Sequence, residues 1–93
     1  NNYELISKFS WFYVPKRNGD YLKRNAIIAL ANNPMPDSHI FFNGLLNSES
    51  EIIRLYSVWA LWRMNRLNTI NKESFYKTEF SKNVIQEYEL LKK

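Results

Sequence analysis

The sequence contains no cysteine at any of its 93 positions. Disulfide frameworks, thiolate zinc sites, cysteine-ligated iron-sulfur clusters and cysteine nucleophiles are therefore excluded from this segment. Long apolar runs are also missing. The longest one, from Ala26 to Ala31, is far shorter than the ~20 residues needed to span a bilayer. We therefore expect no membrane segment and no membrane partner.

Histidine and paired carboxylates are equally scarce. His39 is the only histidine, and no histidine, serine or aspartate stands at a spacing that would complete a metal site or a catalytic triad. The acids Glu49 and Glu51, like Glu87 and Glu89, are two residues apart and would point away from each other on a helix. The sequence therefore predicts a segment that is itself non-catalytic and holds no metal or cofactor.

The chain is rich in apolar side chains and carries excess positive charge. Hydrophobic residues make up 45% of it and aromatic residues 16%, which supplies a folded core and argues against disorder. At this length we predict one domain over residues 1–93. Because the first residue is Asn1 rather than methionine, we expect a piece of a longer protein. The net charge of +4 suits a polyanionic partner without requiring one.

The spacing of apolar residues predicts helices over most of the chain. The first ends before Pro15, because the residue before a proline disfavours helical geometry. Asp20 and Asp37 are placed to cap the second and the third helix. These three helices are expected over residues 3–14, 20–31 and 37–47.

A capping box marks the start of the fourth helix. Ser48 is followed three residues later by Glu51, so that the hydroxyl can accept from an amide while the carboxylate reaches back. We predict a helix over residues 49–65 with two apolar stripes, which indicates packing on both sides. A last helical region, apolar every three or four positions from Tyr76 through Phe80 to Leu91, is expected to cover the open end. In the helix over residues 49–65, one apolar stripe consists of Ile52, Leu55, Tyr56, Trp59 and Trp62, and the other of Ile53, Ala60, Leu61 and Met64.

The second and fourth helices match each other at an offset of 31 residues. The aligned pairs are Leu22 with Ile53, Lys23 with Arg54, Ala26 with Ser57, Ile27 with Val58, and Ala29-Leu30 with Ala60-Leu61. A helix pair cannot bury its apolar face alone, so repeated pairs stack on one another. The sequence therefore predicts an all-α fold of HEAT-like helical repeats, about two helix pairs plus flanking terminal helices. The alternative is a chance match between two amphipathic helices.

Three stretches carry a family resemblance: YLKRNAIIALAN at residues 21–32, LLNSES at residues 45–50, and Ile53-Arg54 followed by VWALWRM at residues 58–64. Together they resemble the C-terminal HEAT-like region of epoxyqueuosine reductase, which modifies the wobble position of tRNA. Trp62 stands where that pattern leads us to expect a small residue.

The resemblance implies that this chain is the C-terminal part of its parent and helps to hold tRNA. It would contact upstream domains of the parent chain. Those domains would hold cobalamin and two iron-sulfur clusters, so any oxidoreductase chemistry would be theirs. We also expect a cytoplasmic location.

Basic residues are the candidate RNA-binding site, and they are densest between residues 8 and 24. Lys23 and Arg54 would hold equivalent positions on stacked helices about 8 to 10 Å apart and line one edge that phosphates could bridge. The alternative is a solvated charged face. For Arg63, and for Arg66 near it, complementing the helix dipole is the simpler explanation. The candidate residues are Lys16, Arg17, Lys23, Arg24, Arg54 and Arg63.

Tryptophans could add stacking platforms for unpaired bases. We expect Trp59 in the core, whereas Trp11 and Trp62 stay open to either role.

The leading hypothesis is a non-catalytic tRNA-binding and positioning domain. The alternative is a HEAT-like scaffold that docks on proteins or on domains of its own parent, which an exposed apolar patch would favour. A HEAT-like DNA-repair glycosylase fragment is a third option, but it needs an acidic residue in a basic concave groove, which the sequence does not place.

Overall fold

The computed structural model describes residues 19–93, which form five α-helices and one 3-10 turn. These residues contain no strand, so the all-α prediction is confirmed for them. The helix predicted over residues 3–14 lies outside the described residues. The elements are α2 (Gly19–Asn32), α3 (Ser38–Leu45), α4 (Glu51–Arg63), η2 (Leu67–Thr69), α5 (Lys72–Thr78) and α6 (Lys82–Leu91).

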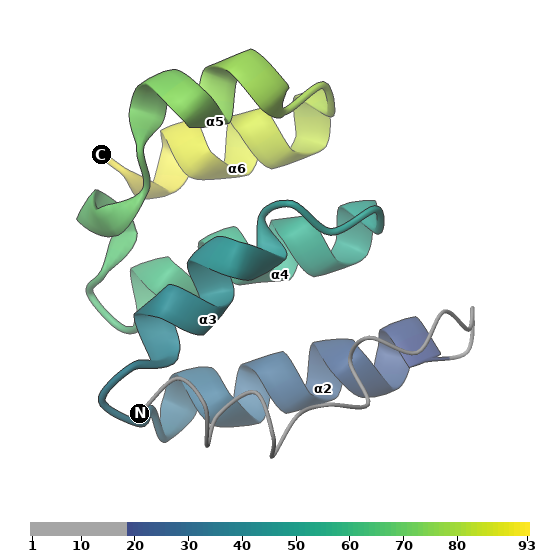
Figure 1. Cartoon of the computed structure of the whole chain (residues 1–93), viewed down its shortest axis with the longest axis vertical. Helices are drawn as coiled ribbons and strands as arrows, with labels where there is room; N and C mark the ends of the chain where they lie inside the picture. Colours follow the sequence, from purple (N-terminus) through teal and green to yellow (C-terminus); the bar gives the residue numbers. More distant parts are fainter. Residues whose placement is uncertain (1–18) are drawn as a thin grey trace.

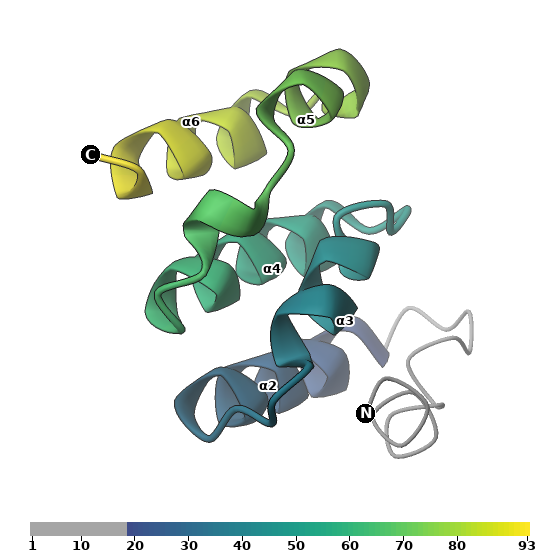
Figure 2. The same cartoon turned by 60° about the vertical axis from the view of Figure 1, so that its left-hand side comes forward.

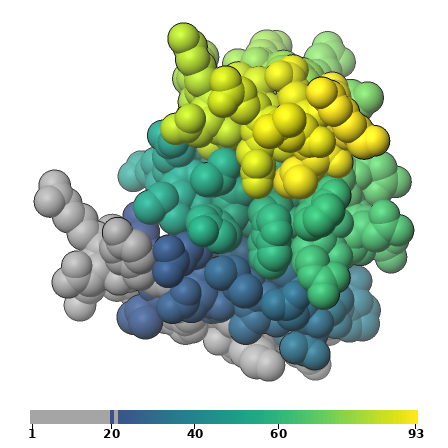
Figure 3. Space-filling view, turned by 180° about the vertical axis from the view of Figure 1, so that it is seen from behind, coloured from purple at the N-terminus to yellow at the C-terminus, as the bar shows by residue number. Residues whose placement is uncertain are grey.

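The helices lie in two layers. Helices α2, α4 and α6 are stacked in a row and run in the same direction, while α3 and α5 lie beside the row and run the opposite way (Figures 1 and 2). Seen from behind, the three stacked helices form successive bands across one face of the molecule (Figure 3). The segments that match at an offset of 31 residues, α2 and α4, are therefore neighbours in space.

Side-chain hydrogen bonds connect the row at a regular interval. Each joins a residue of one helix or cap to a residue 30, 31 or 32 positions along, at the same end of the next helix. Parallel helices with a step of about 31 residues produce this pattern. The Ser50 hydroxyl donates to Asp20 at 3.0 Å, the Arg63 Nε–H donates to Asn32 at 3.1 Å, and the Asn83 amide donates to Glu51 at 3.1 Å.

Serine caps show the same interval and correct one prediction. Ser50, not Ser48, is the N-cap of α4, where its hydroxyl accepts from the Ile53 amide at 3.3 Å. Ser48 instead accepts from the Ser50 amide at 3.1 Å, so the helix begins two residues later than predicted. Thirty-one positions beyond Ser50, Ser81 caps α6 and accepts from the Val84 amide at 3.4 Å. The interval of 31 residues between capping serines thus links α4 with α6, a pair that the sequence match did not include.

The start of α3 differs from the prediction in its capping bond. Asp37 occupies the N-cap position, as predicted, but its side chain makes no capping hydrogen bond to the helix amides. The Ser38 hydroxyl accepts a hydrogen bond from the Met35 amide at 2.8 Å. The turn that precedes α3 is therefore closed by Ser38.

The last helical region is two helices rather than one. Helix α5 ends at Thr78 and α6 begins at Lys82, and Phe80 between them is 89% exposed. The apolar spacing placed Phe80 on a buried stripe together with Val84 and Tyr88. Only the latter two are buried, because the chain turns at Glu79 and restarts at the Ser81 cap.

Helix α4 ends in a left-handed turn. Asn65 has φ of 59°, the only positive value among non-glycine residues of the described segment. Its amide donates to the Trp62 carbonyl at 2.9 Å, and the Arg66 amide donates to the Leu61 carbonyl at 2.7 Å. These two bonds define a Schellman motif, which satisfies terminal carbonyls and redirects the chain. The turn fixes where Arg66 leaves the helix.

Helix α4 is the centre of the core and packs against α2, α3, α6 and η2. Of the two predicted apolar stripes, the one that contains Ile53, Ala60 and Leu61 is buried, whereas Ile52 and Trp62 of the other stripe are exposed. The core consists of Ile27, Leu30, Ala31, Phe41, Phe42, Leu45, Ile53, Val58, Ala60, Leu61, Ile70, Phe75, Val84 and Tyr88.

We predict that Ser81→Ala lowers the free energy of unfolding by about 1 kcal/mol, because the Val84 amide loses its capping acceptor. Urea denaturation measures the change. Gln86→Ala, at an exposed position inside the same helix, is the control and should leave stability nearly unchanged. Equal effects from the two substitutions would show that the cap does not hold α6.

Candidate nucleic-acid interface

The structure disperses the predicted RNA-binding residues. Lys16 and Arg17 lie outside the described residues. Lys23 is buried, with 8% of its surface exposed. The Arg24 guanidinium is half-buried and lies 5.8 Å from the centre of the Tyr56 ring. These positions do not form one continuous exposed row.

Arg63 is the exception among the described candidates, because it is exposed at the end of α4. Its Nε–H donates to the Asn32 amide oxygen at 3.1 Å. That bond turns the side chain toward the end of α2. Arg63 also lies in the last turn of α4, where a cation complements the helix dipole.

The half-buried Arg54 forms an ion pair with the buried Glu79. Its Nε–H donates to both carboxylate oxygens of Glu79, at 2.9 and 3.2 Å, and its Nη1 donates to the Ser48 carbonyl at 2.9 Å. The Glu79 side chain is 3% exposed and also accepts from the Ser81 amide at 3.1 Å. Arg54 therefore ties the loop before α4 to the loop before α6. The expected exposed edge of Lys23 and Arg54 is corrected: Lys23 is buried and Arg54 is used inside the fold.

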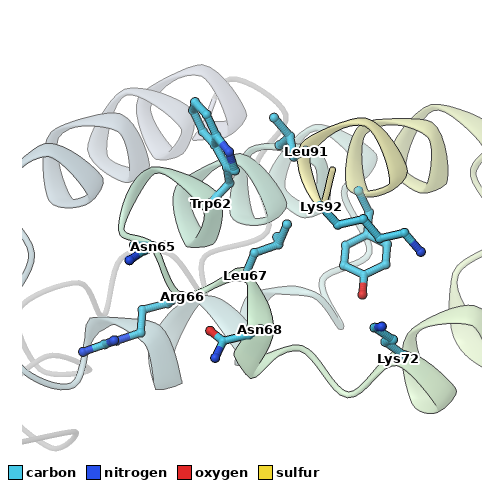
Figure 4. Close-up of a pocket in the computed structure, with 9 residues that line it drawn as sticks. Trp62, Asn65, Arg66, Leu67, Asn68, Lys72, Leu91 and Lys92 are labelled. Carbon is cyan, nitrogen blue, oxygen red and sulfur yellow. The ribbon is translucent and has the colours of Figure 1, made fainter.

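A groove at the opposite end of α4 gathers cations instead. It has a volume of about 590 Å³ and lies between the C-terminal ends of α4 and α6, the turn that contains η2, and the start of α5 (Figure 4). The described residues that line it are Trp62, Asn65, Arg66, Leu67, Asn68, Lys72, Tyr88, Leu91 and Lys92.

The groove is positively charged. Arg66, Lys72 and Lys92 line it, and none of the described lining residues is an aspartate or glutamate. The Lys92 Nζ donates to the Tyr76 hydroxyl at 3.2 Å and lies 5.3 Å from the centre of the Tyr88 ring. The hydrogen bond to Tyr76 raises the pKa of Lys92, so this side chain is charged at neutral pH. Burial raises the pKa of Tyr88, so its phenol stays neutral there and adds no opposing charge.

The groove has an apolar side and a polar side. Trp62 and Leu91 lie on one side, Arg66, Asn68 and Lys72 on the other, and Leu67 lies between them (Figure 4). Trp62 is 44% exposed, so it lies at the surface rather than in the core. Trp59 packs partly buried against the core, with its ring edge-on to Tyr56 at 6.4 Å.

Sequence reasoning missed this cluster because its cations are far apart in the chain. Arg66 and Lys92 are 26 positions apart, and neither belongs to a dense basic stretch. The signal that could have found them is the position of cations at the ends of helices. Because α4 and α6 run parallel, residues that follow their C-terminal ends meet at one edge, and α5 begins there as well.

The described residues show no metal centre and no membrane-crossing element. No group of three or more His, Asp or Glu side chains within residues 19–93 is placed to hold a metal ion. None of the helices in this range combines the length and the apolar character that a bilayer crossing requires.

Comparison with known protein families, with curated proteins and with solved structures finds no match to this chain.

We predict that Arg54→Ala lowers the free energy of unfolding by about 3 kcal/mol, because it leaves the Glu79 carboxylate buried without its ionic partner. Adding Glu79→Gln to Arg54→Ala should recover part of the loss, and this non-additivity is measured by urea denaturation of the single and double variants.

Arg63→Ala is the matched control for this series. It removes an exposed arginine from the same helix and should cost less than about 1 kcal/mol. Additive costs for the Arg54 and Glu79 substitutions would contradict a direct contribution of the pair to stability.

Proposed function

We propose that this chain is a HEAT-like helical-repeat module that binds RNA without catalysing a reaction. The observation that carries the proposal is the groove in which Arg66, Lys72 and Lys92 gather without a carboxylate among its described lining residues. Phosphates placed there would release bound counterions, which drives association of nucleic acid with basic proteins.

The arrangement of the helices supports a repeat architecture. Helices α2, α4 and α6 are parallel neighbours, Ser50 and Ser81 cap the last two 31 positions apart, and α3 and α5 run the opposite way beside the row. A helix pair repeated with a fixed step is the organisation of α-solenoids, in which each unit buries its apolar face against the next. HEAT-like units of this kind are our proposal for the fold family.

We further propose that the RNA is tRNA and that the parent is a tRNA-modifying protein similar to epoxyqueuosine reductase. The support is the resemblance of roughly residues 9–64 to that family's C-terminal region. The chain's own residues offer no thiolate for an iron-sulfur cluster, because the sequence lacks cysteine. Cobalamin and the clusters would therefore have to be held by upstream domains of the parent, while this segment binds and orients the tRNA.

A protein-docking scaffold is the second candidate, and exposed apolar side chains favour it. Phe80 is 89% exposed on the loop between α5 and α6, and Leu90 is exposed on α6. Aromatic and aliphatic side chains of this kind often anchor protein interfaces. The two proposals use different surfaces, because neither Phe80 nor Leu90 lines the basic groove.

We predict that the full 93-residue chain binds a folded tRNA with an affinity that falls steeply as salt concentration rises. Replacing Arg66 and Lys72 together by glutamate should reduce the slope of log affinity against log salt by about two, because each phosphate contact contributes about one unit. Fluorescence anisotropy of labelled tRNA at several salt concentrations measures both quantities.

Lys77→Glu is the matched control, because Lys77 is an exposed lysine of the same helix as Lys72 and lies outside the groove. An equal loss in this variant would mean that net charge, not the groove, drives binding. Failure of the unaltered chain to bind tRNA at low salt would overturn RNA binding and favour the scaffold.

A further inference from the structure

Trp62 is a large aromatic side chain that the described part of the fold leaves at the surface. It sits in the last turn of α4 and is 44% exposed. The other aromatic side chains of this region make ring contacts, Tyr56 with Trp59 and Phe75 with Tyr76 and Tyr88, whereas none of the ring contacts within residues 19–93 includes Trp62. One face of the groove is thus an indole available for stacking.

The backbone around Trp62 is fixed before any ligand arrives. The Trp62 carbonyl accepts the Asn65 amide at 2.9 Å inside the Schellman turn, and the Arg66 amide is held at 2.7 Å by Leu61. One hydrogen-bonded turn therefore presents an aromatic side chain, Trp62, and a cation, Arg66, four residues apart in the sequence. Preorganisation of this kind reduces the entropy that binding would otherwise cost.

The two sides of the groove match the two chemical parts of a nucleotide. The volume of about 590 Å³ falls within the range of about 300 to 1,000 Å³ that is usual for small-ligand sites. Trp62 and Leu91 form the apolar side, while Arg66 and Lys72 lie at the two ends of the polar side, where backbone phosphates would be neutralised (Figure 4). The amides of Asn65 and Asn68 supply both donors and acceptors for the edge of a base.

A paired base cannot use such a platform, because both of its faces are covered by its neighbours in the duplex. We propose that the groove binds an unpaired nucleotide of a single-stranded RNA segment or loop, with the base stacked on Trp62 and the backbone phosphates on its two sides held by Arg66 at one end and Lys72 at the other. The proposal rests on the proposed RNA-binding function and adds to it the structural class of RNA that is recognised.

The test compares three labelled oligonucleotides with equal numbers of phosphates: a single-stranded RNA, an abasic single strand, and an RNA duplex. The full chain should bind the base-containing single strand most tightly. Trp62→Leu should weaken that binding about tenfold, as the loss of one stacked base would, and should leave binding of the abasic strand unchanged. Trp62→Phe, which keeps an aromatic face, should retain most of the affinity.

Phe80→Leu is the matched control, since it removes a more exposed aromatic side chain outside the groove, and it should change nothing. Thermal melting followed by circular dichroism establishes that the Trp62 variants are folded, and quenching of tryptophan fluorescence by the single strand, lost in Trp62→Phe, gives a second readout.

Each contrary result has its own meaning. Equal binding of the abasic and base-containing strands, both unaffected by Trp62→Leu, would overturn base stacking and leave charge-driven RNA binding intact. No binding of any oligonucleotide at low salt would overturn the proposed function itself. An acidic peptide of equal charge that binds as tightly and loses affinity with Trp62→Leu would assign the groove to a protein ligand and overturn the proposal.

Discussion

Helix α4 has to be covered on several sides at once, and the rest of the fold follows from this. Its Ile53, Val58 and Leu61 are buried, and they require α2 along one flank, α6 along the other and α3 across the second layer. The buried Ser57 is compatible with this position because its hydroxyl donates to the Ile53 carbonyl at 2.7 Å. Removing any one of these three helices would expose an apolar face that α4 cannot cover alone.

The two ends of the stacked row have different physical roles. At the N-terminal ends, the Arg54–Glu79 pair and the hydrogen bonds from Ser50 to Asp20 and from Asn83 to Glu51 join neighbouring helices, so polar groups there are used to hold the stacked row together. At the C-terminal ends, terminal carbonyls of α4 are satisfied by the turn at Asn65, and Arg66 and Lys92, which follow α4 and α6, offset the negative ends of those helix dipoles. The charged groups that hold the fold together and the cations that line the groove therefore lie at opposite ends of the stacked helices.

Particular residues show how far sequence reasoning extended into the fold. The offset of 31 residues correctly paired α2 with α4, because Ile27 and Leu30 match Val58 and Leu61 in character. The match did not extend to α6 because Tyr88 stands where Ser57 would align and Glu89 where Val58 would, although Val84 and Tyr88 are buried like Ile53 and Ser57. The break at Glu79 was equally hidden, since the arginine that stabilises it lies 25 positions earlier.

The sequence by itself determined the helical class, the approximate helix positions and the exclusion of thiolate chemistry, because these depend on composition and on spacing within single helices. Only the tertiary structure decided which cations are available. Lys23 and Arg54 look like surface residues in the chain but are buried or paired, while Arg66, Lys72 and Lys92 line one groove although they are distant in the sequence. The exposure and pairing of a side chain are set by neighbours on other helices, and local sequence does not specify those neighbours.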